Sequence, residues 1–280
     1  MEVFTSVVSL RSYLQSQRAL HHSIGLVPTM GALHEGHVSL IQTAVSENDI
    51  VVCSIFVNPV QFNNPDDLAK YPRTEEADLK ILEQAGCSAA FVPSVTEMYP
   101  STPKTTFNFG PVETVMEGKS RPGHFSGVGI VVARLFHIAQ PDHAYFGQKD
   151  LQQVSVIRQL VTDLAFPVQL VVCPTVRETD GLAMSSRNRR LNEKQRHLAP
   201  KIYEALNRAK EQLQEGISTE EVSRNVADFF AGFPDFHLDY FEVSDAVSLQ
   251  TIKTVDKKNK TALCIAIYLG EVRLIDNVVF

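Results

Sequence analysis

The sequence predicts an α/β protein, with a Rossmann-like parallel sheet in an N-terminal domain and a smaller α+β C-terminal domain. Over the first ~175 residues, short apolar runs alternate with helical stretches, as βαβ units do. The remainder has helical stretches followed by two strand-like runs. The 280 residues also suit two domains at roughly 150 residues each. We expect the boundary between residues 175 and 190 and place the domains at 1–176 and 177–280.

In the N-terminal part, each apolar run ends at a residue that stops a strand or a helix. The β-branched run 50–57 ends at Asn58-Pro59, Gly86 follows the helical stretch 75–85, and Pro141 follows another. Strands are expected over residues 24–27, 50–57, 89–92, 144–146 and 168–173, with helices after residue 36 and over 75–85, 128–138 and 151–164.

The C-terminal part begins with helix signals. Asn192 is expected to cap a helix that runs toward Gly216 and kinks at Pro200. A capping-box pattern at 218–221 predicts a second helix. Strands are expected over 236–243 and 262–269, with a polar segment rich in Lys and Asp between them. Together these elements predict the smaller α+β domain.

Composition excludes several classes of protein. A net charge of −6 argues against nucleic-acid binding, which needs a basic surface. Apolar runs are strand-sized, well short of the ~18 residues that a membrane helix needs, so no membrane partner is expected. The four cysteines form no CxxC pair, which disfavours a zinc site or a disulfide framework. A soluble cytoplasmic protein is the expectation.

Parallel strands bring their carboxyl ends to one edge of a sheet, so the segments after them are candidate sites. After residue 27 come His34 and His37, three apart at a helix start, where free N–H groups suit a phosphate. The intervening Gly36 allows close approach of a ligand. A metal pair is the main alternative use, but no third ligand is found by spacing.

The later strand ends carry complementary polar groups. Asn58 and Gln61 offer uncharged amides for hydroxyls or a carboxylate, unless they belong to a solvated loop. Lys149 suits phosphates and Asp150 a ribose. Segment 184–188 has two hydroxyls and a guanidinium, which form a polyphosphate grip or an ordinary linker. Segment 119–125 is a basic loop that is either an anion clamp or a solvated loop. Neither GxGxxG nor GxxxxGK[ST] is present, which disfavours dinucleotide and P-loop sites.

These motifs resemble those of a known family. His34-Glu35-Gly36-His37 resembles the HIGH-type motif of nucleotidylyl transferases, and Met184-Ser185-Ser186-Arg187 resembles their KMSKS-type loop. Within that superfamily the chain is similar to the pantoate–β-alanine ligases. Their signatures are matched at 27–37, 54–62, 71–74, 120–128, 141–153, 180–188 and 273–277.

The resemblance implies an enzyme that condenses (R)-pantoate with β-alanine. ATP is the co-substrate with Mg²⁺, an acyl adenylate is the intermediate, and AMP and pyrophosphate are released. His34, His37 and Lys149 would be catalytic, with His37 as the acid. Gln61 and Gln153 would bind pantoate, and Gln61 and Asn58 would contact β-alanine. The implied ATP-binding residues are Met30, Gly31, Ala32, Leu33, His34, Glu35, Gly36, His37, Gly147, Gln148, Lys149, Asp150, Val176, Met184, Ser185, Ser186 and Arg187.

The resemblance also implies that the C-terminal domain acts as a lid with a hinge at 175–190, and that a homodimer forms through the N-terminal domain. Two other functions stay open on the residues alone. One is a nucleotidylyltransferase that keeps the nucleotide on its product, and the other is a nucleotide-binding module without catalysis. A tRNA-charging enzyme is disfavoured by the negative net charge. Neither the residue types nor the resemblance assigns individual roles to residues 71–74 and 120–125.

Overall fold

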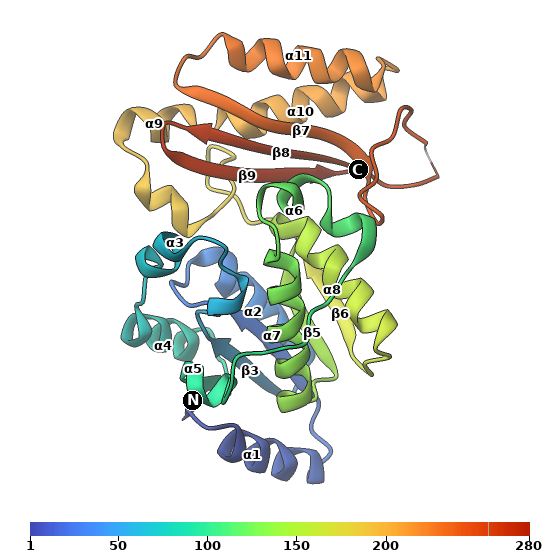
Figure 1. Ribbon diagram of the computed structural model, residues 1–280. Coiled ribbons are helices and arrows are strands. Elements are labelled where there is room, and N and C mark those ends of the chain that lie inside the picture. The colour runs from blue at the N-terminus through green and yellow to red at the C-terminus, as the bar shows by residue number, and fades with distance from the viewer. Residues whose placement is uncertain (257) are drawn as a thin grey trace.

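The computed structural model describes residues 1–256 and 258–280 and contains two sheets (Figure 1). The larger sheet has six parallel strands in the order β1-β4-β3-β2-β5-β6. Its strands are β1 (Glu2–Phe4), β2 (Ile24–Thr29), β3 (Ile50–Ile55), β4 (Ala89–Phe91), β5 (His143–Gly147) and β6 (Gln169–Cys173). The order reverses between β2 and β5, which is the topological switch point where such sheets bind ligands.

Helices cover both faces of this sheet, because its central strands are apolar on both sides. One face packs against α1 (Val7–Ala19), α7 (His124–Ala139) and α8 (Leu151–Asp163). The other face packs against α2 (Glu35–Glu47) and α4 (Glu75–Gln84). The connections hold three short helices, α3 (Pro65–Lys70), α5 (Val95–Met98) and α6 (Met116–Ser120).

The second sheet is antiparallel, in the order β7-β8-β9. Its strands are β7 (Phe236–Asp245), β8 (Thr261–Leu269) and β9 (Val272–Val279). Its outer face packs against α10 (Lys201–Gln214) and α11 (Thr219–Ala231) in a separate apolar core, and α9 (Glu193–Leu198) precedes them. These three strands and three helices are called the C-terminal unit below.

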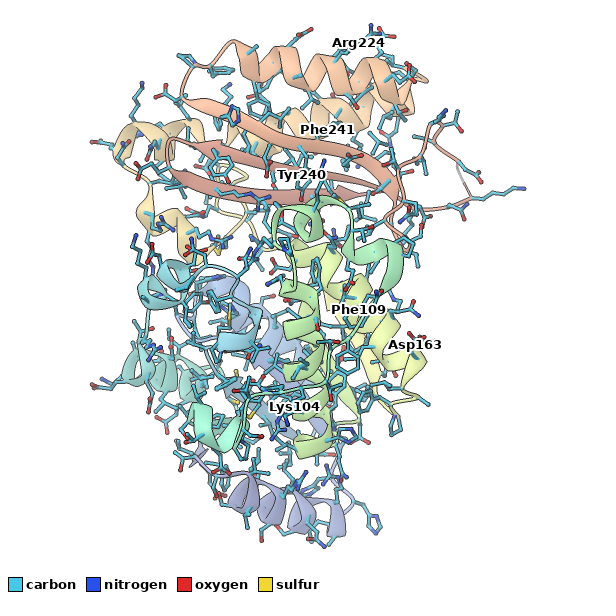
Figure 2. All side chains as sticks on the ribbon, viewed as in Figure 1. Lys104, Phe109, Asp163, Arg224, Tyr240 and Phe241 are labelled. Carbon is cyan, nitrogen blue, oxygen red and sulfur yellow. The ribbon has the colours of Figure 1, made fainter. Side chains whose placement is uncertain are left out.

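The C-terminal unit lies over the carboxyl edge of the larger sheet, beside α6 (Figure 1). A small apolar cluster joins the two parts, with Met116 and Leu151 below and Leu249, Ala262 and Cys264 above. A largely buried ion pair reinforces this joint, since Arg273 donates to both carboxylate oxygens of Glu117 at 2.7 and 2.9 Å. Tyr240 lies on the C-terminal sheet (Figure 2), and its hydroxyl donates to Glu117 at 3.1 Å.

The predicted fold class is confirmed, and the strands and helices lie where the patterns placed them, within a few residues. Six strands and helices were missed: β1 and α1 at the amino end, β9 at the carboxyl end, and the short helices α3, α5 and α6 in the connections. The kink expected at Pro200 is a full break, because α9 ends at Leu198 and α10 begins at Lys201. A proline inside a helix removes a hydrogen bond and clashes with the preceding turn. The Asn192 cap forms a capping box with Gln195, and Ser218 caps α11.

Candidate functional site

A cavity of about 500 Å³ lies between the carboxyl edge of the larger sheet and the C-terminal unit. The segments after β2, β3, β5 and β6 all contribute to its walls, and β7, β8 and β9 contribute Tyr240, Cys264 and Asn277. Segments separated by more than a hundred residues therefore share one chamber. Its volume suits a small-molecule ligand.

The turn after β2 is held by a buried carboxylate. Asp78 on α4 is 1% exposed and accepts the backbone N–H groups of Ala32 (2.9 Å) and Leu33 (2.8 Å). Gly31 and Ala32 both have positive φ, and a Cβ at Gly31 would lie 2.9 Å from the Asp78 carboxylate. The turn therefore requires glycine at position 31. At Ala32 the hydrogen bonds to Asp78 offset the strain of the positive φ. This turn sets the start of α2 and hence both histidines.

The two histidines cap α2 reciprocally. The Gly36 N–H donates to Nδ1 of His34 at 3.1 Å, and the His34 N–H donates to Nδ1 of His37 at 3.3 Å. Because both Nδ1 atoms accept, each ring carries its proton on Nε2. Burial, and then the positive charges of Lys149 and Arg189, lower the pKa of His34 to about 4. Burial, and then His34, lower the pKa of His37 to about 3. Both imidazoles are therefore neutral hydrogen-bond donors near pH 7.

The wall around the histidines is basic. Lys149 is 18% exposed, and its Nζ lies 3.9 Å from the Asp150 carboxylate. Among the acids of the cavity, Glu117 is paired with Arg273 and Asp276 with Arg177. The basic side chains on the cavity wall are Lys70, Arg121, Lys149, Arg187, Arg189 and Arg190. This excess of positive charge suits a polyphosphate.

The cavity lining also includes apolar side chains and a few amides. Val131 and Leu135 of α7 and Phe146 of β5 supply apolar surface, and Gln61 and Gln153 supply amides. Gln61 is 7% exposed, and its amide donates to the sulfur of Met30 at 3.1 Å. Such a surface takes a small molecule that combines methyl groups with hydroxyls or a carboxylate.

Asn58 lies beneath Gln61 and is 1% exposed. Its Nδ2 donates to the Gln61 side chain (3.0 Å) and to the Gly127 carbonyl (3.1 Å). Its Oδ1 accepts from the Val60 N–H and the Tyr99 hydroxyl. All four hydrogen-bonding positions of the amide are thus used within the protein. A direct contact between Asn58 and a ligand would require one of these bonds to break.

His124 holds the same segment from α7. Its Nδ1 donates to the main-chain carbonyl of Gln61 at 2.8 Å. Burial, followed by the positive charge of Arg121, lowers the pKa of His124 to about 4. One turn further, a Cβ at Gly127 would lie 2.5 Å from the Val60 carbonyl oxygen. Only glycine therefore lets α7 approach closely enough to support Gln61.

Most residues predicted for the site line this cavity. They are Met30, Ala32, His34, Gly36, His37, Asn58, Gln61, Gly147, Lys149, Asp150, Gln153, Val176, Met184, Ser185, Ser186 and Arg187. Four others lie outside its lining. Gly31 faces Asp78, Leu33 is buried in the core behind the sheet, Glu35 is exposed, and Gln148 contacts Asn277.

Several cavity residues were not singled out from the sequence. Arg121 and His124 come from the basic loop 119–125, which chemistry alone left undecided between a clamp and a solvated loop. Tyr71 lines the cavity, and burial raises its pKa to about 12. Asp78 had no signal, because nothing near it in the chain marks it as the support of a distant turn.

Two further observations bound the chemistry. Within residues 1–256 and 258–280, no three His, Cys, Asp or Glu side chains gather as a metal-ligand group. Over the same residues, no helix has the length and apolar character needed to cross a membrane.

A parallel sheet with a basic, histidine-containing chamber at its switch point, covered by a second unit, defines a nucleotide-dependent α/β enzyme. The chain belongs to the pantoate–β-alanine ligase family: the family model described as "Pantoate-beta-alanine ligase" matches residues 2–279. Pantothenate synthetase of Porphyromonas gingivalis is 50% identical over 278 residues, which is 99% of each chain. That of Cytophaga hutchinsonii is 48% identical over 276 residues, or 98% of each.

Solved structures agree with this assignment. The pantothenate synthetase structure from Thermus thermophilus matches with a TM-score of 0.92 and 42% identity, over 99% of both chains. The Francisella tularensis pantoate-beta-alanine ligase, in complex with beta-gamma ATP and beta-alanine, matches with a TM-score of 0.82 and 38% identity. That match covers 99% of this chain and 97% of the other.

Proposed function

We propose that this protein condenses (R)-pantoate with β-alanine, using ATP, to give pantothenate, AMP and pyrophosphate through an enzyme-bound pantoyl adenylate. The supporting observation is that one chamber is lined both by histidines and basic side chains and by apolar side chains and glutamine amides. A triphosphate suits the first set of groups, and a hydroxy acid with methyl groups suits the second. Membership of the ligase family supports the same reaction.

In the first step a pantoate carboxylate oxygen attacks the α-phosphorus of ATP. The new O–P bond forms as the bond to pyrophosphate breaks, and negative charge grows on the departing oxygens. Lys149 and the Nε2–H groups of His34 and His37 are the donors that stabilise this charge. In the protein without ATP the pKa of His37 is about 3, so the imidazole is neutral when ATP binds, and we assign it as a hydrogen-bond donor and not as an imidazolium acid.

In the second step the β-alanine amine attacks the acyl carbon. A C–N bond forms, the C–O bond to AMP breaks, and the amine loses a proton. AMP is a far better leaving group than the oxide of a free carboxylate, so adenylation makes this step possible. Water would hydrolyse the adenylate, and the C-terminal unit limits its entry by covering the chamber.

For pantoate, we place the two methyl groups on the apolar surface formed by Val131, Leu135 and Phe146, with Gln61 and Gln153 on the polar groups. Gln61 also faces β-alanine. The resemblance suggests Asn58 beside the β-alanine amine. The four hydrogen bonds that the Asn58 side chain makes within the protein favour a different role, which is to hold Gln61 in place.

For ATP, we place Asp150 on the ribose and the Val176 backbone on adenine. The Val176 carbonyl accepts the Met184 N–H, which fixes this stretch of backbone beside the chamber, and we place adenine on the Val176 N–H. Ser185, Ser186 and Arg187 close over the phosphates. The remaining predicted ATP-binding residues shape the turn after β2 and the segment after β5.

Mg²⁺ fits this chamber as a partner of the ATP phosphates. It prefers oxygen ligands and commonly takes one or two carboxylates together with phosphates. With Asp150 placed on the ribose, and Glu117 and Asp276 paired with arginines, Asp67 is the remaining carboxylate among the described residues of the chamber wall and would hold the ion. When bound, the ion would neutralise phosphate charge during adenylation.

We further propose that residues 1–176 and 177–280 are the two functional domains, with the second as a lid. The resemblance supports a homodimer formed through the N-terminal domain, which light scattering would test. The four cysteines are free in the structure, which supports work in the reducing cytoplasm.

The test of the function is incubation with ATP, Mg²⁺, (R)-pantoate and β-alanine, omitting each in turn, while AMP and pyrophosphate are measured. Pyrophosphate exchange that needs pantoate, and free AMP that needs β-alanine, are the expected results. A nucleotide retained on the product would indicate a nucleotidylyltransferase. ATP binding without turnover would indicate a non-catalytic module.

A further inference from the structure

The C-terminal strand β9 reaches into the segment that carries the site lysine. Asn277 is 3% exposed, and its Nδ2 donates to the carbonyls of Gln148 and Lys149, both at 2.9 Å. Its Oδ1 accepts from the Gln148 side chain at 3.4 Å. The side chain therefore directs its hydrogen bonds to a segment 128 and 129 residues away and not to its own sheet.

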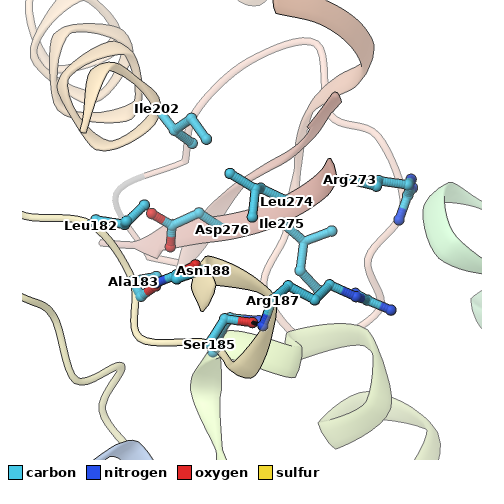
Figure 3. Close-up of a pocket in the computed structure, with 11 residues that line it drawn as sticks. Leu182, Ala183, Ser185, Arg187, Asn188, Ile202, Arg273, Leu274, Ile275 and Asp276 are labelled. Carbon is cyan, nitrogen blue, oxygen red and sulfur yellow. Dashed lines mark hydrogen bonds between the residues drawn. The ribbon is translucent and has the colours of Figure 1, made fainter. Parts of the chain in front are cut away.

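A second set of contacts ties Asn277 to the segment proposed for adenine. Arg177, which directly follows Val176, donates to Asp276 at 2.7 and 3.0 Å and to the Asn277 carbonyl at 3.2 Å. The guanidinium lies 3.7 Å from the ring centroid of Tyr203. Asp276 lies on β9 near Leu182 and Ala183 (Figure 3). Residues 176–177, β9 and the lysine segment thus form one connected network.

We propose that Asn277 is a positioning residue for Lys149, so that the C-terminal unit completes the phosphate site through the main chain as well as covering it. This inference rests on the proposed function. The ammonium group of lysine sits at the end of a flexible side chain, so its position depends on the position and orientation of the Lys149 main chain. Two hydrogen bonds from one amide fix the peptide groups on either side of the Lys149 Cα. A displacement of about 1 Å at a catalytic group can cost on the order of 100-fold in rate.

The test is a double-mutant cycle on pantoate-dependent ATP–pyrophosphate exchange, with Asn277→Ala, Lys149→Ala and the double variant. Asn277→Ala should lower kcat by roughly 10- to 100-fold while the KM for pantoate changes by less than about threefold. In the Lys149→Ala background the same substitution should change the rate by less than about threefold, because its target is already gone. Asn277→Asp, which keeps the shape but loses both donors, should behave like alanine.

The matched control is Ser244→Ala, which removes a buried side-chain hydrogen bond from the same sheet, to the Ala262 carbonyl. It should leave the exchange rate within about twofold of the parent. If Asn277→Ala lowers the exchange rate by the same factor in the parent and in the Lys149→Ala variant, the inference is overturned, since the two substitutions would then act independently. An Asn277→Ala protein that fails to fold by circular dichroism would overturn it as well. Absence of exchange in the parent protein would instead reject the proposed function.

Discussion

Replacing His37 and His124 together by asparagine should weaken the loss of stability between about pH 7.5 and pH 5. His124 is buried and His37 is half-buried in the cavity wall, and both are neutral, with pKa values of about 4 and 3 in the folded protein against an unfolded value of about 6.5. The unfolded chain therefore binds more protons as the pH falls below about 6.5, so the free energy of unfolding decreases. The decrease continues until the pH reaches the folded values.

The magnitude follows from the width of this interval. Each pH unit is worth about 1.36 kcal/mol per group, so by pH 5 each histidine removes about 2 kcal/mol and the pair about 4 kcal/mol. This is a large part of the roughly 5–15 kcal/mol that stabilises a typical domain. His34 is left out of this sum because it is more exposed to solvent.

Urea unfolding at the two pH values, followed by far-UV circular dichroism, measures the effect; the chain has no tryptophan for fluorescence. Asparagine suits both positions. At position 37 its Oδ1 can accept the His34 N–H, and at position 124 its Nδ2 can donate to the main-chain carbonyl of Gln61. Comparing variant with parent cancels the titration of every other group. The exposed His21→Asn serves as control. If parent and double variant lose equal stability, the two histidines are not held neutral and the reasoning is refuted.

Three other substitutions test the site. Lys149→Ala should slow pantoate-dependent exchange by roughly two to four orders of magnitude, and a rate within about threefold of the parent would show that its role is wrong. Gln153→Ala should raise the KM for pantoate more than that for ATP in steady-state kinetics, and equal changes would count against its placement beside the acid. Asn58→Ala should destabilise the protein by about 1–3 kcal/mol in urea, because it removes the acceptor of the buried Tyr99 hydroxyl; unchanged stability would contradict its positioning role.

The sequence by itself determined the sheet and the edge at which the site lies. Apolar runs alternating with helical stretches lead to parallel strands, and parallel strands place their carboxyl ends together. That geometry is why His34, Asn58 and Lys149, far apart in the chain, could be expected in one chamber. The elements missed had weak patterns: β1 is three residues long, and β9 alternates buried and half-buried positions around charged side chains.

Only the tertiary structure decided which residues hold these side chains in place and which protonation state they have. Asp78 holds the turn before His34 across 45 residues, and Asn277 holds the Lys149 segment across 128. Local patterns cannot reveal such pairs, because hydrogen bonding depends on which elements meet in space. The same holds for charge: partial burial among neighbouring elements, and then His34, lower the pKa of His37 and keep it neutral. Asn58 shows the limit most clearly, since its residue type suggested a ligand contact and its surroundings occupy every hydrogen-bonding position of its amide.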